Sequence, residues 1–199
     1  MRKIKNVYIS SIYQNAGKTT VSLGLYKILS EKKMKPVFLK PVGQQTVRTG
    51  GLDIDKDSYL LAAVYRCKSM KEMSPVTIGR GYTEKYIVSP RPDDLRQKIV
   101  AAFDKLTPGR GVIIIEGTGH AGVGSVVDVS NADVAALLGS KVIIVSEGGI
   151  GKCIDEIMLN KALFDVKGVE VLGVIVNKVL PEKYDRVKKA LTLGLQHKG

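Results

Sequence analysis

The stretch SSIYQNAGKTT, residues 10–20, separates a short apolar segment at residues 6–10 from a segment with helical periodicity at residues 19–30. A loop that binds phosphate needs backbone N–H groups curled around the anion and a helix N-terminus directed at it. A strand, a glycine-containing loop and a helix, in this order, supply both. The stretch therefore predicts a phosphate-binding loop near the start of an α/β fold.

The residues of this loop match the chemistry of a nucleotide phosphate site. Gly17, Lys18 and Thr19 occupy the last three positions of the pattern G-x-x-x-x-G-K-[ST], although Ile12 stands where the pattern has its first glycine. In this pattern the lysine reaches the β- and γ-phosphates and the hydroxyl binds Mg²⁺. The alternative is an exposed lysine at a helix start. We expect the following residues to bind the nucleotide: Asn15, Ala16, Gly17, Lys18, Thr19 and Thr20.

Apolar and amphipathic segments alternate along the rest of the chain. The expected strands are residues 6–10, 37–39, 112–116, 142–146 and 171–176, and the expected helices are residues 19–30, 57–66, 92–108, 131–138, 154–164 and 182–195. The run VIIIE at residues 112–116 is apolar without alternation, as is typical of a strand covered on both faces. This order predicts the α/β class, with a mainly parallel sheet, helices on both faces and the connections of a P-loop NTPase.

Two segments have less regular patterns. Residues 43–56 are polar and contain glycines, which predicts a loop. Residues 67–90 carry mixed signals, and we expect them to form an excursion on the substrate side of the sheet. The expected helix caps are Asp57 or Ser58 for residues 57–66, and Ser130 or Asn131 for residues 131–138.

The length of 199 residues predicts a single P-loop nucleotide-binding domain over residues 1–199. The sequence ends after an expected helix, so either this helix is the edge of the fold or the chain is a fragment truncated at its C-terminus. No apolar run reaches the ~18 residues that span a bilayer, and the basic start lacks the long apolar region of a signal peptide. The two cysteines are too few for a disulfide framework or a metal cluster. We therefore expect a cytoplasmic protein without membrane association.

The charge balance is strongly basic, with 31 Lys and Arg against 19 Asp and Glu and a net charge of +12. Cationic surfaces attract nucleic acids without reading their sequence. However, the basic residues are scattered along the chain, and only three Phe and no Trp are present to stack on bases. Solvated helix faces and loops explain the charge better than nucleic-acid binding does.

A carboxylate ends the most apolar expected strand. Glu116 begins the sequence EGTGH at the end of residues 112–116. An acidic residue at the carboxyl end of a buried strand, beside a phosphate loop, can bind Mg²⁺ directly or through water. The alternative is a solvated carboxylate at a strand end. His120, in the same turn, either touches the substrate or the γ-phosphate or is a hydrogen-bonded loop residue.

A lysine and three aspartates follow the second expected strand. Lys40 begins the sequence KPVGQ at the sheet edge where α/β folds bind ligands, so it can hold a substrate or transition-state anion in catalysis. A surface lysine is the alternative. Asp53, Asp55 and Asp57 could complete a metal site, because Mg²⁺ commonly takes one or two carboxylates with phosphate and water. Alternate aspartates also suit helix capping, and Asp57 is the metal-ligand candidate among the three.

Two later strands are also followed by candidate residues. Asn177 and Lys178 come after residues 171–176, where a side-chain amide could read the edge of a base. Gly148, Gly149 and Gly151 form a tight turn into a helix, which either borders the nucleotide or only connects two elements.

Together these motifs resemble those of the dethiobiotin synthetase family of P-loop ATPases, and the resemblance covers most of the chain. It rests on GKT after the first strand, KPVG after the second, a helix start at Asp57, EGTG after the third long strand and VIVNK near the end. Related domains are the amidotransferase-associated ATPases of corrin biosynthesis and the N-terminal domain of long phosphotransacetylases. The strings KPVGQ and EGTGH look closer to the phosphotransacetylase domain.

The resemblance implies ATP with Mg²⁺ held by Lys18, Thr19, Asp57 and Glu116, with Lys40 at the reacting centre and Asn177 near the adenine. It also implies phosphoryl transfer that activates a carbamate, in which the lysines and the metal offset the developing charge. Two features depart from the true synthetase. An acidic residue usually stands where this chain has Asn15, and hydroxyl-bearing residues stand where it has Gly43, Gln44 and Gln45.

Three functions stay open on the sequence alone. The first is an ATP-dependent ligase-like enzyme or ATP hydrolase that activates a small carboxylate or carbamate. The second is a nucleotide-sensing regulatory domain with little turnover, and the third is a nucleic-acid-associated ATPase. The expected partners are a nucleotide and a small-molecule substrate, and a homodimer is compatible with a P-loop class that often completes its sites across a two-fold axis.

Overall fold

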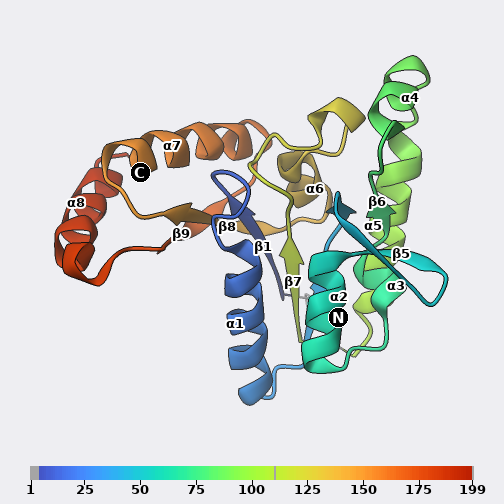
Figure 1. The fold of residues 1–199 in the computed structure, drawn as a ribbon. Coiled ribbons are helices and arrows are strands. Elements are labelled where there is room, and N and C mark those ends of the chain that lie inside the picture. Colours follow the sequence, from blue (N-terminus) through green and yellow to red (C-terminus); the bar gives the residue numbers. More distant parts are fainter. Residues whose placement is uncertain (1–4, 110, 199) are drawn as a thin grey trace.

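A five-stranded sheet forms the centre of the computed structural model, which describes residues 5–109 and 111–198 (Figure 1). The strands are β1 (Lys5–Ser11), β2 (Pro36–Leu39), β7 (Val112–Glu116), β8 (Lys141–Glu147) and β9 (Val171–Asn177). Their order is β2-β7-β1-β8-β9, and every neighbouring pair is parallel. The predicted α/β class with a mainly parallel sheet is confirmed.

Helices connect these strands. They are α1 (Lys18–Glu31), α2 (Lys56–Tyr65), α3 (Met70–Met73), α4 (Tyr82–Val88), α5 (Pro92–Leu106), α6 (Asn131–Leu137), α7 (Gly151–Val166) and α8 (Tyr184–Gln196). Short 3₁₀ turns lie at Ser125–Val127 and Pro181–Lys183. Helix α1 packs against β1, β2 and β7, and Figure 1 shows it in front of the sheet with α6 behind.

The central strand β7 explains how the sheet brings its functional edge together. All five residues of β7 are buried, as a parallel strand covered on both faces requires. In the register, Ile9 of β1 lies opposite Glu116, and Leu39 of β2 lies opposite Ile115. The loop after β1, the residue after β2 and the end of β7 therefore meet at one edge of the sheet.

Local sequence signals set several helix ends as expected. Pro92 lies at the first position of α5, where its missing N–H costs no hydrogen bond. Ser130 caps α6: its Oγ accepts a hydrogen bond from the Asp133 N–H at 3.0 Å, and the Asp133 carboxylate accepts one from the Ser130 N–H at 3.1 Å. This reciprocal capping box settles the choice between Ser130 and Asn131.

The predicted cap of α2 was wrong by two residues. The N-cap is Asp55, whose Oδ1 accepts a hydrogen bond from the backbone N–H of Asp57 at 2.9 Å. Asp57 lies in the first turn of the helix, and its side chain bonds to Lys40 instead. Ser58 donates its hydroxyl hydrogen to the carbonyl of Met73 at 3.0 Å. Asp55 has the capping role because it directly precedes the first residue of the helix and its carboxylate accepts from the Asp57 N–H.

The prediction of a loop at residues 43–56 was also wrong. Strands β4 (Thr46–Thr49) and β5 (Leu52–Asp55) pair antiparallel across a two-residue turn at Gly50 and Gly51, whose φ angles are 55° and 78°. Such a turn requires positive φ at both positions, which glycine adopts without strain. The pair Gly-Gly between alternating apolar residues was the signal for a hairpin, and the polar composition of the segment obscured it.

The segment at residues 67–90 forms three short elements. Helix α3 is followed by β6 (Val76–Thr77), which pairs in parallel with β3 (Val42–Gly43) next to Lys40. Helix α4 follows, and its Tyr86 donates a hydrogen bond to the Asp128 carboxylate at 3.0 Å. The side of β2 is thus covered by α3 and its flanking loops.

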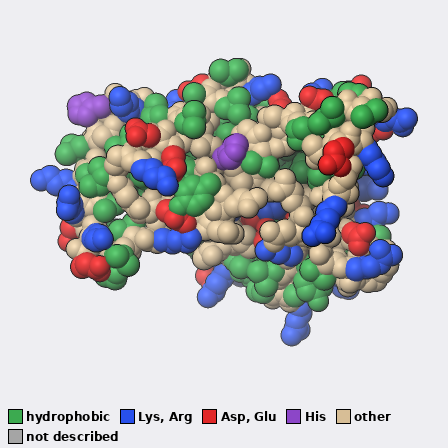
Figure 2. All heavy atoms as spheres, turned by 45° about the horizontal axis from the view of Figure 1, so that its top comes forward, with side chains coloured by type: hydrophobic (Ala, Val, Ile, Leu, Met, Phe, Trp, Pro, Cys, Tyr) green, Lys and Arg blue, Asp and Glu red, His purple; other side chains and the backbone are tan. Residues whose placement is uncertain are grey.

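The surface shows no concentration of positive charge on the face that Figure 2 presents. Basic and acidic side chains are interspersed there, with apolar side chains between them. This agrees with the scattered basic residues of the sequence. None of the helices within the described residues is long and apolar enough to cross a membrane.

Candidate nucleotide-binding site

The loop between β1 and α1 curls its backbone around the N-terminus of the helix. Asn15 and Gly17 both adopt left-handed conformations, with φ angles of 65° and 109°. Alternation of this kind points successive N–H groups into a concavity that binds anions. No described side chain caps α1, so its first N–H groups are available to a phosphate.

Lys18 lies under this loop rather than in solvent. Its side chain is buried, and its Nζ donates a hydrogen bond to Ser11 Oγ at 2.8 Å. Burial and the nearby Lys40 ammonium lower the pKa of Lys18 to about 8, against a weaker opposite effect of Glu116 and Asp57. A bound phosphate would supply the counter-charge that the ammonium lacks.

Three of the predicted residues form a buried ionic cluster behind the loop. The Lys40 Nζ contacts Asp57 Oδ2 at 2.8 Å and Glu116 Oε1 at 2.9 Å, and it donates to the Gly117 carbonyl at 3.1 Å. The hydroxyl of Thr19 donates to the same Glu116 oxygen at 3.1 Å. The fold therefore brings residues from four separate segments to one point.

The protonation states of this cluster are tightly linked. Burial alone would lower the pKa of Lys40, but Glu116, Asp57 and Asp55 outweigh it and raise the pKa well above its ordinary value. Burial raises the pKa of Asp57, but the Lys40 ammonium dominates and lowers it overall. Lys40 is thus a permanent cation at this point of the structure.

The cluster has the donor set that a hard divalent cation requires. Glu116 is completely buried, and its Oε2 has no hydrogen-bond partner among the described residues. A buried carboxylate oxygen is costly to leave unpaired, so this oxygen is suited to bind a cation. Together with Asp57 and the Thr19 hydroxyl, it offers the oxygen ligands that Mg²⁺ prefers. The residues present therefore fit a magnesium ion.

The other two aspartates, Asp53 and Asp55, do not bond to Lys40 and have other roles. Asp53 is exposed and forms an ion pair with Arg48 at 3.6 Å across the β4–β5 hairpin. Asp55 is buried as the cap of α2, and its backbone N–H donates to Ser74 Oγ at 2.9 Å. Burial first, and then the neighbouring Asp57 carboxylate, raise the pKa of Asp55 despite the Lys40 ammonium.

Asn177, at the end of β9, reaches the phosphate loop. Its Nδ2 donates to the carbonyl of Ala16 at 3.1 Å. A Cβ atom on Gly17 would lie 2.1 Å from that nitrogen, so a residue with a side chain cannot replace Gly17 without displacing Asn177. Thr20 lines the cavity in front of the loop with Asn15 and Gly17. The predicted loop residues and Asn177 are thus neighbours.

Sequence reasoning missed a network that supports the loop from the outside. Glu147, at the end of β8, accepts hydrogen bonds from the Tyr13 hydroxyl and from Lys178. Lys178 also donates to the carbonyl of Asn15 at 2.7 Å. These hydrogen bonds, from Lys178 first and then Tyr13, lower the pKa of Glu147. The position of Glu147 at the carboxyl end of an expected strand was the one sequence signal that could have identified it as a site residue.

A second missed residue organises the EGTGH turn. Asn131 is buried; its amide donates to the carbonyls of Thr118 at 2.8 Å and His120 at 2.6 Å, and its Oδ1 accepts from Tyr8 at 2.8 Å. His120 itself is exposed and accepts a hydrogen bond from the Gly122 N–H at 3.2 Å. This hydrogen bond matches the second of the two roles expected for His120, that of a hydrogen-bonded loop residue.

A cavity of about 340 Å³ opens in front of the loop and the ionic cluster. Lys18, Thr19, Lys40, Asp57 and Glu116 all line it, which places the predicted catalytic and metal residues on one surface. Gln44, Gln45 and Thr118 lie on the same lining. The volume of this cavity lies within the range of small-molecule binding sites.

Comparisons with known proteins agree with this geometry. A family model described as an AAA domain matches residues 5–194. An ATP-dependent dethiobiotin synthetase of Methanococcus vannielii is 30% identical over 86% of this chain and 78% of its own length. A phosphate acetyltransferase of Pseudomonas aeruginosa is 30% identical over 83% of this chain, but the match spans only 23% of that relative.

Solved structures show the same fold at lower identity. The kinase domain of the Escherichia coli tyrosine kinase ETK is 19% identical, with a TM-score of 0.54 over 89% of this chain and 68% of that one. A candidate plasmid partition protein of Borrelia burgdorferi, bound to AMPPNP, is 14% identical with a TM-score of 0.53 over 100% of both chains. Fold, loop and relatives together lead to one conclusion: this chain belongs to the P-loop ATPase family that includes dethiobiotin synthetase and part of the phosphate acetyltransferases, and it is a nucleotide-binding protein.

Proposed function

We propose that this protein uses Mg²⁺ and ATP to phosphorylate a small carboxylate or carbamate, as a ligase-like enzyme or ATP hydrolase. The observation that carries the proposal is the cluster of Lys40, Asp57 and Glu116 against Thr19 of the phosphate loop, with Glu116 Oε2 unpaired. The dethiobiotin synthetase relative is named as ATP-dependent, which supports ATP as the nucleotide.

Each residue has a separate role in this proposal. The N–H groups at the start of α1 and the Lys18 ammonium bind the β- and γ-phosphates, and we assign the Asn177 amide, which bonds to the Ala16 carbonyl, to the base. Thr19, Asp57 and Glu116 would hold Mg²⁺, which supplies positive charge to the phosphate oxygens when bound. Lys40 keeps a positive charge next to these carboxylates, where it can offset the charge of the transferred group.

The acceptor side of the cavity supports a small polar substrate. Gln44 and Gln45 are exposed and line the same cavity as the phosphate loop, and each carries an amide that donates and accepts hydrogen bonds. Thr118 donates its hydroxyl hydrogen to the carbonyl of Val42 at 2.5 Å, which fixes that side of the cavity. Amide donors suit a carboxylate or carbamate acceptor.

Phosphate release from Mg-ATP tests the proposal, with Lys18→Ala as the blank. The assay runs with and without diaminopelargonate and bicarbonate, the acceptor pair of dethiobiotin synthesis. Lys40→Gln should lower turnover by roughly 10²-fold while nucleotide affinity changes by less than about threefold. Lys56→Gln is the matched control, because Lys56 lines the same cavity without contacting the ionic cluster. Equal losses of turnover and affinity in Lys40→Gln would argue against a catalytic Lys40.

A regulatory domain is the second candidate, and the matches to part of the phosphate acetyltransferases favour it. In that case ATP binds and stabilises the fold, but phosphate release stays negligible with every acceptor tested. ATP and ADP would then favour different conformations or oligomers. Sedimentation velocity with each nucleotide measures this and also tests for a homodimer; one monomeric species throughout would remove the oligomer-switch form of this candidate.

A further inference from the structure

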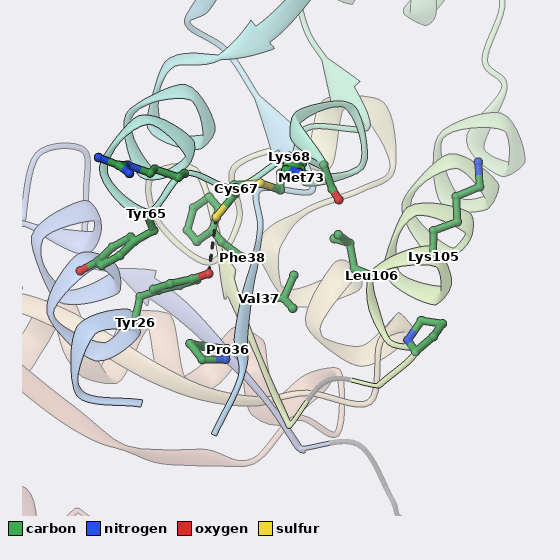
Figure 3. A pocket seen from close by; sticks show the side chains of 13 residues that line it. Tyr26, Pro36, Val37, Phe38, Tyr65, Cys67, Lys68, Met73, Lys105 and Leu106 are labelled. Atoms are coloured by element: carbon green, nitrogen blue, oxygen red, sulfur yellow. Dashed lines mark hydrogen bonds between the residues drawn. The ribbon is translucent and has the colours of Figure 1, made fainter. Parts of the chain in front are cut away.

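A second cavity lies away from the nucleotide site, beside the edge strand β2. Its volume is about 390 Å³, and none of its lining residues belongs to the lining of the nucleotide cavity. Figure 3 shows Tyr26 and Tyr65 on one side of it, Lys105 and Leu106 on the opposite side, and β2 between them. A volume of this size is in the range of small-molecule binding sites, which is roughly 300–1,000 Å³.

The charges around this cavity all have one sign. Arg66, Lys68 and Lys105 line it, and no Asp or Glu does. Within residues 5–109 and 111–198, none of these three cations forms an ion pair. All three are exposed at the rim of the pocket, where their charges create a positive potential that attracts anions.

The rest of the lining is apolar and aromatic. The rings of Tyr26 and Tyr65 stack with their centroids 4.3 Å apart, and both hydroxyl groups have partners within the protein. Tyr65 donates a hydrogen bond to the Leu23 carbonyl at 2.8 Å, and the Tyr26 hydroxyl contacts Cys67 Sγ at 3.4 Å. Phe38 and Leu106, both buried, add apolar surface. A ligand here would meet a flat aromatic wall on one side and cations at the rim.

We propose that this cavity, which we call the β2 pocket, binds a small organic anion with an aromatic or apolar body. The tyrosines and the β2 side chains would pack against the body, and Lys68 and Lys105 would neutralise its carboxylate, sulfonate or phosphate group. The proposal does not depend on the reaction at the nucleotide site, since the two linings share no residue.

The β2 pocket is connected to the ionic cluster through one carbonyl group. Met73 lines the pocket, and its carbonyl accepts hydrogen bonds from the Lys40 N–H at 2.8 Å and from the Ser58 hydroxyl at 3.0 Å. Helix α2 carries Asp57 in its first turn and ends at Tyr65, in the pocket wall. A ligand that shifts Met73 or α2 would move both partners of the Lys40–Asp57 ion pair, so the pocket is placed to regulate nucleotide binding.

Cys67 provides a reporter for the potential inside the pocket. It lines the cavity and is partly exposed, whereas the other cysteine, Cys153, is 3% exposed. We compare its rate of reaction with the dianionic disulfide 5,5′-dithiobis(2-nitrobenzoate) and with the neutral 4,4′-dithiodipyridine, and subtract the rate of Cys67→Ser. Lys68→Gln and Lys105→Gln should each lower the ratio of anionic to neutral rate by about threefold at low salt. Lys189→Gln, an exposed change on α8 at the other end of the sheet, should leave the ratio unchanged.

Binding is then measured by protection of Cys67 from the neutral reagent. Benzoate is the probe, and a ligand of this size binds in roughly the millimolar range. Benzoate should protect saturably in the wild type and several-fold more weakly in Lys68→Gln, while benzyl alcohol and inorganic phosphate protect little. Mg-ATP affinity, measured with saturating benzoate, should change by twofold or more.

Specific outcomes would overturn the proposal. A rate ratio that is the same in Lys68→Gln, Lys105→Gln and Lys189→Gln would show an ordinary surface cysteine among scattered lysines. Equal protection by benzyl alcohol would remove the need for an anion, and equal protection by phosphate would remove the need for an organic body. Protection without any change in Mg-ATP affinity would remove the connection to the nucleotide site.

Discussion

The two halves of the sheet, β2–β7–β1 and β8–β9, differ in how completely their side chains are buried. On the β2–β7–β1 side every residue of β7 is buried, and Ile114 is 0% exposed. On the opposite side, the edge strand β9 leaves Leu172 52% exposed and Ile175 38% exposed. The well-covered side is the one that buries its oppositely charged groups: Lys40 and Glu116 are both buried, whereas the ion pair of Lys178 with Glu147 on the β8–β9 side is partly exposed. The comparison shows that close packing is concentrated where buried charges must be held in register, because misplaced charges are costly there.

Removal of Lys40 should have the largest effect on stability. Lys40→Ala leaves Glu116 buried and Asp57 half-buried without their cation, and breaking a buried pair such as Lys40–Glu116 costs roughly 3–5 kcal/mol. Chemical denaturation in the presence of a chelator measures the change. Lys161→Ala is the matched control, since its 2.8 Å pair with Asp165 within α7 is partly exposed and should be worth less than about 1 kcal/mol.

Magnesium sharpens the same comparison. If the carboxylates form the cation site, Mg²⁺ should stabilise Lys40→Ala more than the wild type, because the ion takes over the charge that the lysine supplied. The free energy of unfolding with millimolar Mg²⁺ gives the result, and Ca²⁺ and K⁺ test the preference. A loss in Lys40→Ala as small as that in Lys161→Ala would show that the cluster is not an electrostatic centre.

Lys18 should make stability depend on alkaline pH. Its pKa is about 8 in the folded chain and about 10.5 when unfolded, so between these values the unfolded state binds the extra proton. Stability should therefore rise from pH 8 to pH 10.5, by up to ~3 kcal/mol relative to Lys18→Met, and the difference should be constant below pH 8. Denaturation at several pH values, with chelator and without nucleotide, measures it. If the free energies of unfolding of the wild type and Lys18→Met changed with pH in the same way, the pKa of Lys18 would not be lowered by burial.

The sequence was sufficient to predict the five strands of the parallel sheet and the main helices between them, since apolar strands, Pro92 at the start of α5 and the serine cap of α6 are local signals. It was also sufficient to select the residues of the ionic cluster, because residues that follow parallel strands meet at one edge. It was not sufficient for Asp57, whose side chain bonds to Lys40, seventeen positions away, while Asp55 caps α2. Contacts that depend on a partner far along the chain leave no local pattern.

The loop-supporting network and the β2 pocket show the same limit. Glu147 and Lys178 are separated by thirty-one positions, and only the register of β8 with β9 makes them partners. The β2 pocket collects its cations from the end of α2, from the segment before α3 and from α5. The scattered charge of the sequence therefore contained a local cluster that no linear pattern revealed.

The loop-supporting network should contribute a moderate amount to nucleotide binding. Lys178→Ala removes the hydrogen bond to the Asn15 carbonyl and the contact with Glu147, so the curled loop becomes less ordered before ATP binds. We expect a three- to tenfold loss of ATP affinity by calorimetry, corresponding to about 1 kcal/mol, with little change in stability. Lys188→Ala on α8 is the control, because Lys188 lies over the ring of Tyr184 and forms no ion pair within the part of the chain that the structure describes. Equal affinities of both variants would assign Lys178 to the surface.

The smallest effect is expected at the β9 edge, and it tests the comparison most directly. Leu172→Thr replaces a 52% exposed side chain by a smaller residue that also favours strands, so the free energy of unfolding should change by less than about 0.5 kcal/mol. Ile114→Ala in β7 should cost roughly 2–5 kcal/mol, since it opens a cavity in close-packed surroundings. The measurement is repeated over a hundredfold range of protein concentration. A larger, concentration-dependent loss in Leu172→Thr would mean that a second copy covers this edge, because only an intermolecular contact makes stability depend on concentration. The loose side of the sheet would then be the dimer interface rather than a tolerant edge.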